Sequence, residues 1–251
     1  MLKKSIISIL MISFILTIVF SHKVKSATLN SERYKITTKT YLSKNNHEDI
    51  KVNYPQISNL SDQEKQHKIN KLIKEAIFKI IKDNSDSNSN DFLTLEIKYA
   101  IKLKSPRILS IQYLGYQHYQ TAAYPNNLFY STNIDVEKGI KLKLSEVVNI
   151  NHDFLKIFKS KGKPRYMAGE AFDQDTILVA KDYIKTDLSD AELIKNFQED
   201  DCPFYFTKSA LGIVIFVTHA MGDNWEFEIE YKDLTSNLKA QNAVGKNFLN
   251  K

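Results

Sequence analysis

Alternation of apolar and polar residues is the strongest pattern along the chain, and it occurs in three successive stretches. In residues 93–104, apolar side chains occupy most odd positions, with Lys, Glu and Thr among the residues between them. Similar runs cover residues 109–119 and 128–136. Because side chains on a strand point to opposite faces in turn, a period of two predicts half-buried strands. The short connections, including a turn at 137–139 that ends in Gly, predict antiparallel pairing.

Before these strands, the apolar residues in 69–81 recur with the period of an α-helix instead. They are spaced i, i+3, i+4, i+7, i+8, i+11 and i+12, which gives one continuous stripe: Ile69, Leu72, Ile73, Ala76, Ile77, Ile80 and Ile81. Ser61 followed by Glu64 has the spacing of a capping box and predicts where the helix begins. Before it, residues 34–57 are rich in β-branched and aromatic residues and are expected to be extended.

The second half of the chain loses the period of two and then regains it. Helices are expected at 145–148, 153–158 and 175–197, with a loop around residues 162–169, where Gly and Pro interrupt the pattern. Residues 204–207 then read as a strand. Residues 211–217 are apolar at nearly every position, which predicts a central strand.

The last predicted strand alternates between two kinds of side chain. Trp225, Phe227, Ile229 and Tyr231 alternate with glutamates at 226, 228 and 230, so one face is expected to be buried and the other acidic and exposed. Strands and helices come in separate groups along the chain. This order predicts an α+β fold, with a largely antiparallel sheet packed against a long amphipathic helix and a second helical segment.

The first 26 residues have the three parts of a secretory signal. Lys3 and Lys4 precede an uncharged apolar run at 6–20, and short side chains at Val24 and Ser26 suit cleavage. We therefore expect a signal peptide at 1–26, a domain at 27–235 with parts at about 34–120 and 121–235, and a polar tail at 236–251. The predicted location is secreted or at the extracytoplasmic face of the membrane, with membrane contact only through an uncleaved signal.

Charge and cysteine content narrow the classes of partner. The formal net charge of +6 falls to +2 when the four lysines of the signal are removed, and the remaining lysines are interspersed with acids. Nucleic acid is therefore not an expected partner. Cys202 is the single cysteine, so an internal disulfide is impossible, and it is expected to be a small buried hydrophobic residue.

The sequence contains no recognisable motif for catalysis, metal binding or cofactor binding. No two of the six histidines lie three or four residues apart, and no nucleophile elbow or glycine-rich phosphate loop is present. The Asp/Asn/Ser-rich segment 83–91 lacks the Gly and Glu of a calcium loop. His219 and Asp223 supply only two groups, so a surface loop is the expected reading. We predict no catalytic residue, no metal and no cofactor, although carboxylates brought together by folding remain an alternative.

The segment 113–130 stands out because it carries five of the 13 tyrosines. Tyrosine offers a broad apolar face and a hydroxyl group, so a tyrosine-rich hairpin suits protein or sugar binding. The alternative is that these residues form cross-strand aromatic pairs with a structural role. The predicted ligand-binding residues are Tyr116, His118, Tyr119, Tyr124, Asn126 and Asn127.

Several short motifs, in this order, resemble the accessory domain that precedes PdaC-type peptidoglycan deacetylases and the C-terminal domain of RsiV-type anti-sigma factors. They lie at 54–60 with Ile69-Asn70, 108–111, 123–127, 133–146, 204–216 and 227–234, and together they cover nearly all of 34–235. The hairpin departs from the family at 121–124, where Thr-Ala-Ala-Tyr replaces a Gly-Gly-Ala-His-like run. The segment after the apolar strand also departs, with residues 219–223 in place of a Pro/Ala-rich turn.

The resemblance implies an extracytoplasmic module on its own. We expect neither the cytoplasmic domain of a sigma-factor regulator before the apolar run nor a deacetylase domain after the module. The expected function is a non-enzymatic binding module of the cell envelope, with a cell-wall glycan or a lysozyme-like protein as its partner. The alternatives are a cell-wall polysaccharide hydrolase or deacetylase-associated protein that uses carboxylates assembled by the fold, and a structural partner of other envelope components.

Overall fold

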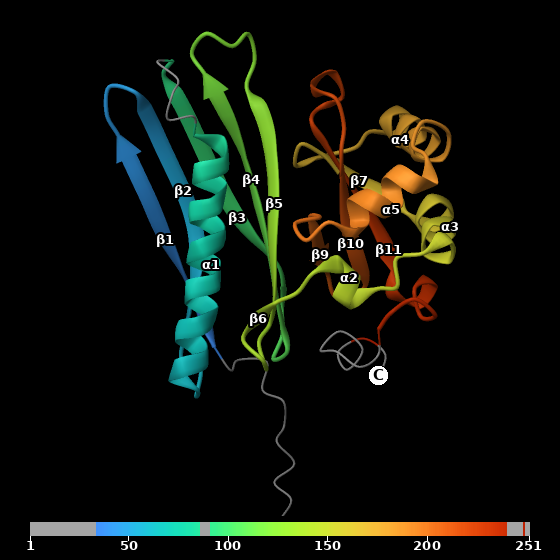
Figure 1. The fold of residues 1–251 in the computed structure, drawn as a ribbon, viewed down its shortest axis with the longest axis horizontal. Helices are drawn as coiled ribbons and strands as arrows, with labels where there is room; N and C mark the ends of the chain where they lie inside the picture. The colour runs from blue at the N-terminus through green and yellow to red at the C-terminus, as the bar shows by residue number, and fades with distance from the viewer. Residues whose placement is uncertain (1–33, 86–90, 240–247, 249–251) are drawn as a thin grey trace, which may run out of the picture.

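Two β-sheets lie against each other, and helices cover their outer faces (Figure 1). The computed structural model describes residues 34–85, 91–239 and Phe248. The predicted signal peptide at 1–26 and most of the predicted tail lie outside these residues. The layers run α1, first sheet, second sheet, and then α3 to α5. This arrangement confirms the predicted α+β class.

The first sheet has six strands in the order β1-β2-β3-β4-β5-β6. They are β1 Lys35–Lys44, β2 Glu48–Ser58, β3 Leu93–Lys104, β4 Ile108–Tyr119, β5 Asn126–Asp135 and β6 Ile140–Lys141. Each neighbouring pair is antiparallel except β2 and β3, which are parallel. A parallel pair needs a crossover, and helix α1 (Gln63–Asn84) supplies it. The expected turn before β6 is present, with Gly139 at φ +64°.

Helix α1 buries the predicted apolar stripe against the first sheet. Ile69, Ile73 and Ile77 are among its buried residues and belong to one core with β2, β3 and β4. The predicted capping box at Ser61 is wrong by one residue, because Asp62 is the N-cap and its side chain accepts a hydrogen bond from the backbone N–H of Lys65. A carboxylate at this position also interacts favourably with the helix dipole, which a serine hydroxyl does not.

The second sheet has five strands in the order β8-β7-β11-β10-β9. They are β7 Lys163–Met167, β8 Glu170–Ala171, β9 Phe204–Phe206, β10 Ala210–Phe216 and β11 Asn224–Glu230, and short 3-10 turns follow β10 at His219–Met221 and β11 at Tyr231–Asp233. Strand β10 lies between two neighbours, as predicted. The predicted loop at 162–169 is wrong, because most of it forms β7, which pairs with β11.

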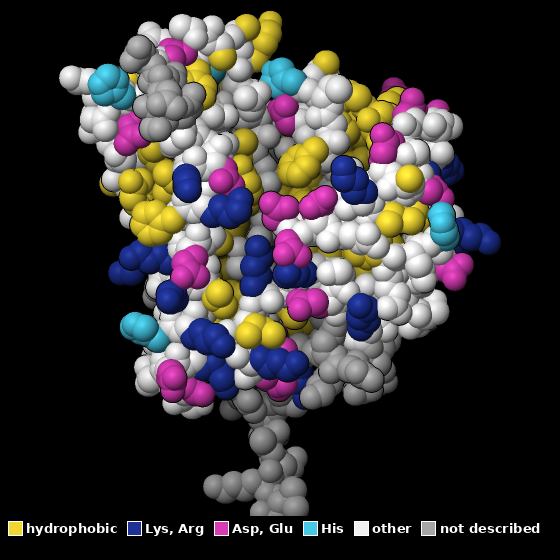
Figure 2. Space-filling model, in the orientation of Figure 1, with side chains coloured by type: hydrophobic (Ala, Val, Ile, Leu, Met, Phe, Trp, Pro, Cys, Tyr) yellow, Lys and Arg dark blue, Asp and Glu magenta, His cyan; other side chains and the backbone are white. Residues whose placement is uncertain are grey.

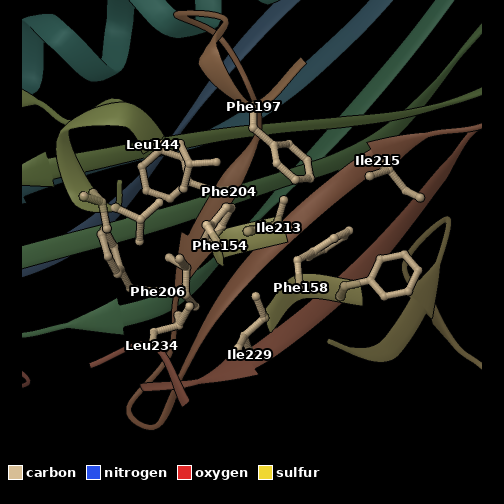
Figure 3. Packing of buried hydrophobic residues seen from close by; sticks show 14 of the residues in the cluster. Leu144, Phe154, Phe158, Phe197, Phe204, Phe206, Ile213, Ile215, Ile229 and Leu234 are labelled. Atoms are coloured by element: carbon tan, nitrogen blue, oxygen red, sulfur yellow. The ribbon is translucent and has the colours of Figure 1, made fainter. Parts of the chain in front are cut away.

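Four helices pack against this sheet, and apolar side chains of both the helices and the strands make up its core (Figure 3). The helices are α2 Leu144–Val147, α3 His152–Lys161, α4 Gln174–Thr186 and α5 Asp190–Gln198. Phe158 of α3 meets Phe197 of α5 edge to face, with ring centroids 5.1 Å apart. The segment predicted as one helix at 175–197 is two, because the Ser189 side chain caps a new helix there.

A further expectation about the C-terminal part is wrong. Glu226 is fully buried between the sheets, so the glutamate face of β11 is not simply an exposed acidic face. Within the predicted tail, Leu238 is buried and forms a bridge with Val148. Phe248 also stacks on Tyr231 at 3.8 Å between centroids. These apolar contacts hold parts of the tail against the core.

Candidate functional site

The surface on which the two sheets meet is unusually polar. Ser110 of β4 donates to the side chain of Asn133 on β5 at 2.6 Å and accepts from the backbone N–H of Phe206 at 2.9 Å. The amide of Asn133 donates in turn to the carbonyl of Phe204 at 2.6 Å. Side chains of the first sheet thus satisfy backbone groups of β9, the edge strand of the second sheet. These bonds fix how the two sheets sit relative to each other.

Glu226 lies in this interface and is the one carboxylic acid among the described residues whose pKa is raised. The Gln112 side chain donates to its Oε2 at 3.0 Å, while its Oε1 has no hydrogen-bond partner in the described part of the chain. Burial raises the pKa of Glu226 to about 7. A pKa near neutral suits a general acid or base, but this carboxyl is 0% exposed and cannot reach a wall polymer from where it lies.

The predicted ligand-binding residues lie at the tip of the β4–β5 hairpin but on two different faces. Tyr116 is opposite Asn127 in the antiparallel register, and Asn127 contacts the second sheet, so this pair points toward that sheet. His118 shares the face of Tyr116 by alternation, and its Nε2 lies 3.1 Å from the carbonyl oxygen of Ala122.

The other two strand residues point the opposite way. Asn126 is opposite Gln117, whose side chain donates to the carbonyl of Asn84 at the end of α1. Tyr119 shares the Gln117 face and packs on the α1 core. The six predicted residues therefore do not form one continuous surface.

The structure joins part of the predicted set to a loop of the second sheet. Asp223 Oδ2 accepts from the backbone N–H of Asn127 at 2.8 Å and from its side-chain amide at 3.1 Å, and Asp223 Oδ1 lies 2.8 Å from His219 Nδ1. The Tyr124 ring, with its residue 71% exposed, lies 6.3 Å from the His219 ring between centroids. We call Tyr124, Asn127, His219 and Asp223 the rim. It joins the hairpin and the β10–β11 loop at the same end of the molecule (Figure 1).

The rim has the chemistry of a recognition surface. Asp223 is held by three polar contacts, so its carboxylate orients Asn127 and His219. Tyr124 leaves its aromatic face exposed, and the His219 side chain is partly exposed while its Nδ1 contacts Asp223. Within residues 34–85 and 91–239, no three His, Cys, Asp or Glu side chains are grouped to hold a metal ion. In the sequence, His219 and Asp223 stand out only as a possible ligand pair. The contact of Asp223 with Asn127, 96 positions away, leaves no local signal.

A second feature is a cleft of about 540 Å³ beside β5, which no pattern in the sequence indicates. It lies between α1, β5, α5 and the end of β10. Most of its wall is apolar, and charged side chains stand around it: Lys79, Asp83, Lys141, Glu199 and Asp201. Figure 2 shows Lys, Asp and Glu side chains gathered on the surface between the part of the molecule that contains the first sheet and the part that contains the second.

A known protein family matches part of the first sheet and α1. Residues 42–125, which run from the end of β1 to the tip of the β4–β5 hairpin, match the profile of the family described as deacetylase PdaC. This segment is therefore similar to the PdaC family. The matched segment contains β2, α1, β3 and β4, together with Tyr124 of the rim. No curated protein matches the chain closely enough to count as a relative.

Solved structures show the same fold over most of the chain. A DUF3298-family member from Bacteroides fragilis covers 86% of this chain and 98% of its own, with a TM-score of 0.56 and 11% identity. A DUF3298-family protein from Pseudomonas aeruginosa covers 82% of this chain and 94% of its own, with a TM-score of 0.50 and 12% identity. The PdaC segment and the second sheet thus occur together in this fold. None of the helices in the described ranges has the length and hydropathy of a membrane span.

Proposed function

We propose that this protein is an exported binding module of the bacterial cell envelope, without catalysis of its own, and that the rim binds a cell-wall glycan. The observation that carries the proposal is the rim itself. Exposed aromatic rings from two separate loops lie beside amide groups, and Asp223 holds the arrangement together. A rigid, exposed Tyr with neighbouring hydrogen-bonding groups is typical of surfaces that recognise ligands. The similarity of residues 42–125 to the PdaC deacetylase family supports a setting in the cell wall.

Binding is favoured over hydrolysis because of where the carboxyl groups lie. A glycoside hydrolase needs two carboxyl groups on either side of an accessible bond, one of them with a raised pKa. Here the acid with a raised pKa is Glu226, which is closed off between the sheets. Asp223, the carboxylate of the rim, is held by hydrogen bonds that orient its neighbours.

A wall-degrading enzyme such as lysozyme is the second candidate ligand, and one observation favours it. The β4–β5 hairpin extends to the end of the molecule (Figure 1), and Tyr124, which lies in its loop, is well exposed. A projecting loop with an aromatic tip can enter the groove of a partner protein.

Calorimetric titration of residues 27–251 with soluble peptidoglycan fragments, and separately with lysozyme, tests the proposal. We expect saturable binding to the fragments, and replacing Tyr124 by Ala is expected to weaken it about tenfold, as for an aromatic side chain at the centre of an interface. Leu178→Ala is the matched control, because Leu178 is also exposed but lies on α4 and is not part of the rim. Binding to lysozyme alone would favour the second candidate.

Two results would contradict the proposal. One is the absence of binding to both ligands by a folded protein. The other is binding that Tyr124→Ala and Asn127→Ala leave unchanged. Export is tested separately, by N-terminal sequencing of the protein recovered outside the cytoplasm, with a new N-terminus near residue 27 as the expected result.

A further inference from the structure

One edge of the first sheet is left unpaired over the middle of β5. This strand pairs with β4 along its whole length but with β6 only through Ile134 and Asp135. The backbone N–H of Asn127 donates to Asp223, and the carbonyl of Asn133 accepts from Leu142, so the backbone groups of both asparagines point away from β4.

The direction of the backbone groups between these two asparagines follows from the hydrogen-bond pattern of the β4–β5 pair. The register with β4 is continuous, and outward-pointing groups alternate along an antiparallel strand, so Phe129 and Ser131 also direct N–H and C=O away from β4. The backbone N–H of Val136 bonds to Arg107 on the β4 side, as this alternation requires. Among the described residues, none hydrogen-bonds to the backbone of Phe129 or Ser131 at this edge. A short row of two donors and two acceptors is therefore open.

This open row faces the 540 Å³ cleft. Four consecutive residues of β5, from 129 to 132, line the cavity. The wall on one side comes from α1, with Ala76 and Ile80, and the wall on the other comes from α5 and β10, with Leu193 and Val214. A chain lying along the edge would therefore have apolar surface on both of its faces.

We propose that the cleft binds an extended peptide, which adds to the first sheet as a strand alongside β5. Its backbone would pair with the four open groups of Phe129 and Ser131, as in other cases of strand addition to a free sheet edge. Its side chains would alternate between the α1 wall and the α5–β10 wall, so both odd and even positions would be apolar, as in a strand covered on both faces.

The charges around the cleft narrow the peptide further. Lys79 pairs with Asp83, which leaves Lys141 facing two acids, Glu199 and Asp201. The net charge of these three side chains is negative, so a peptide with a lysine or arginine at either end of its apolar stretch is favoured. An acyl chain would fill the same apolar space but would leave the open donors and acceptors without partners, which is costly in a buried position.

The probe is a fluorescein-labelled peptide, Lys-Ile-Val-Thr-Val-Ile-Lys, capped at both ends and titrated into the protein by fluorescence anisotropy. Two further peptides carry N-methyl groups on alternate residues, one set on odd and one on even positions. We expect one set to bind like the parent and the other to lose at least about tenfold in affinity, because only one set removes the donors that face β5. This site lies apart from the rim, so its test is independent of the proposed function.

Amide exchange and a pair of variants locate the site. The amides of Phe129 and Ser131 are expected to gain protection when the peptide binds, while those of Leu128 and Tyr130, already bonded to β4, serve as internal controls. Ala76→Trp fills the cleft and is expected to abolish binding. Glu75→Trp places the same side chain on the exposed side of α1 and should leave binding unchanged, with denaturation curves showing that both variants fold.

Four results would overturn the proposal. The peptide does not bind at millimolar concentration. Both methylated peptides bind as well as the parent, which would indicate an apolar ligand held without strand pairing. The two tryptophan variants behave alike, which would place the site elsewhere. The amides of Phe129 and Ser131 are already protected without peptide, which would mean that another part of this chain occupies the edge.

Discussion

Replacing Glu226 by Gln should change how the stability of the protein depends on pH. The substitution keeps the shape of the side chain and an acceptor for the Gln112 amide, but it removes the ionisable group. Burial raises the pKa of Glu226 from its ordinary 4.5 to about 7, so between these values the folded protein holds a proton that the unfolded chain has lost. The contribution of Glu226 to stability is full below pH 4.5 and is lost as the pH rises through 7.

The size of the effect follows from the shift in pKa. A shift from 4.5 to about 7 corresponds to about 3 kcal/mol between the acid and the alkaline limits, since each pKa unit is worth about 1.4 kcal/mol. Lys102 faces the same interface, where its Nζ lies 4.3 Å from the centroid of the Tyr205 ring, and its charge lowers the pKa against the larger effect of burial. The natural protein should therefore lose up to about 3 kcal/mol relative to Glu226→Gln between pH 4.5 and pH 8.

Urea denaturation of the two proteins at half-unit steps from pH 5 to pH 8 measures this difference directly. Other titrating groups affect both proteins alike and cancel. Glu230→Gln is the control, because Lys163 and Lys232 lower the pKa of Glu230 to about 2, below the whole range, so this variant should run parallel to the natural protein. Parallel curves for Glu226→Gln as well would refute the reasoning and would mean that water reaches the carboxyl.

Three further predictions concern single positions. Asp62→Ala should lower the free energy of unfolding by about 1 kcal/mol in chemical denaturation, because it removes the side-chain cap on the N–H of Lys65, and Asp62→Ser should restore most of it. Gly212→Ala should cost more than about 2 kcal/mol, since a Cβ there would lie 2.2 Å from the Tyr205 ring, and a smaller residue at 205 should recover part of the loss if this clash is the cause. Cys202 should react with iodoacetamide at pH 8 far more slowly in the folded than in the unfolded protein, because burial raises the pKa of its thiol to about 12; equal rates would contradict this.

The elements that the sequence predicted correctly are those whose pattern is local. The stripe on α1 and the alternation in β3 reflect one buried face each, and a buried face leaves a period that can be read without the rest of the fold. Strand β7 was not predicted, because Lys163-Pro-Arg-Tyr-Met is short, lies between two glycines and contains a proline. Its place in the sheet depends on pairing with β11, which is 57 or more residues away in the chain.

The candidate site was harder to predict because its contacts are distant in sequence. The alternation of β11 suggested that Glu226 faces solvent, since a sequence cannot show that a second sheet covers that face. The tyrosine content of the hairpin can be read from the sequence, but which side chains lie on which face depends on the register of β4 and β5. The bonds from Asn127 to Asp223 join segments that no motif relates.

The polar interface between the sheets also has a consequence for how the molecule is made. The first sheet and α1 come from one continuous stretch, 35–141, which emerges from the ribosome before any strand of the second sheet. The face that will later be covered carries Ser110, Gln112 and Asn133 among its apolar residues. Until the second sheet forms, water can hydrogen-bond to these side chains. The partly synthesised protein therefore exposes a face that is less prone to aggregate than a wholly apolar face would be. The same polar groups that align the two sheets at the end can therefore lower the risk of aggregation at the beginning.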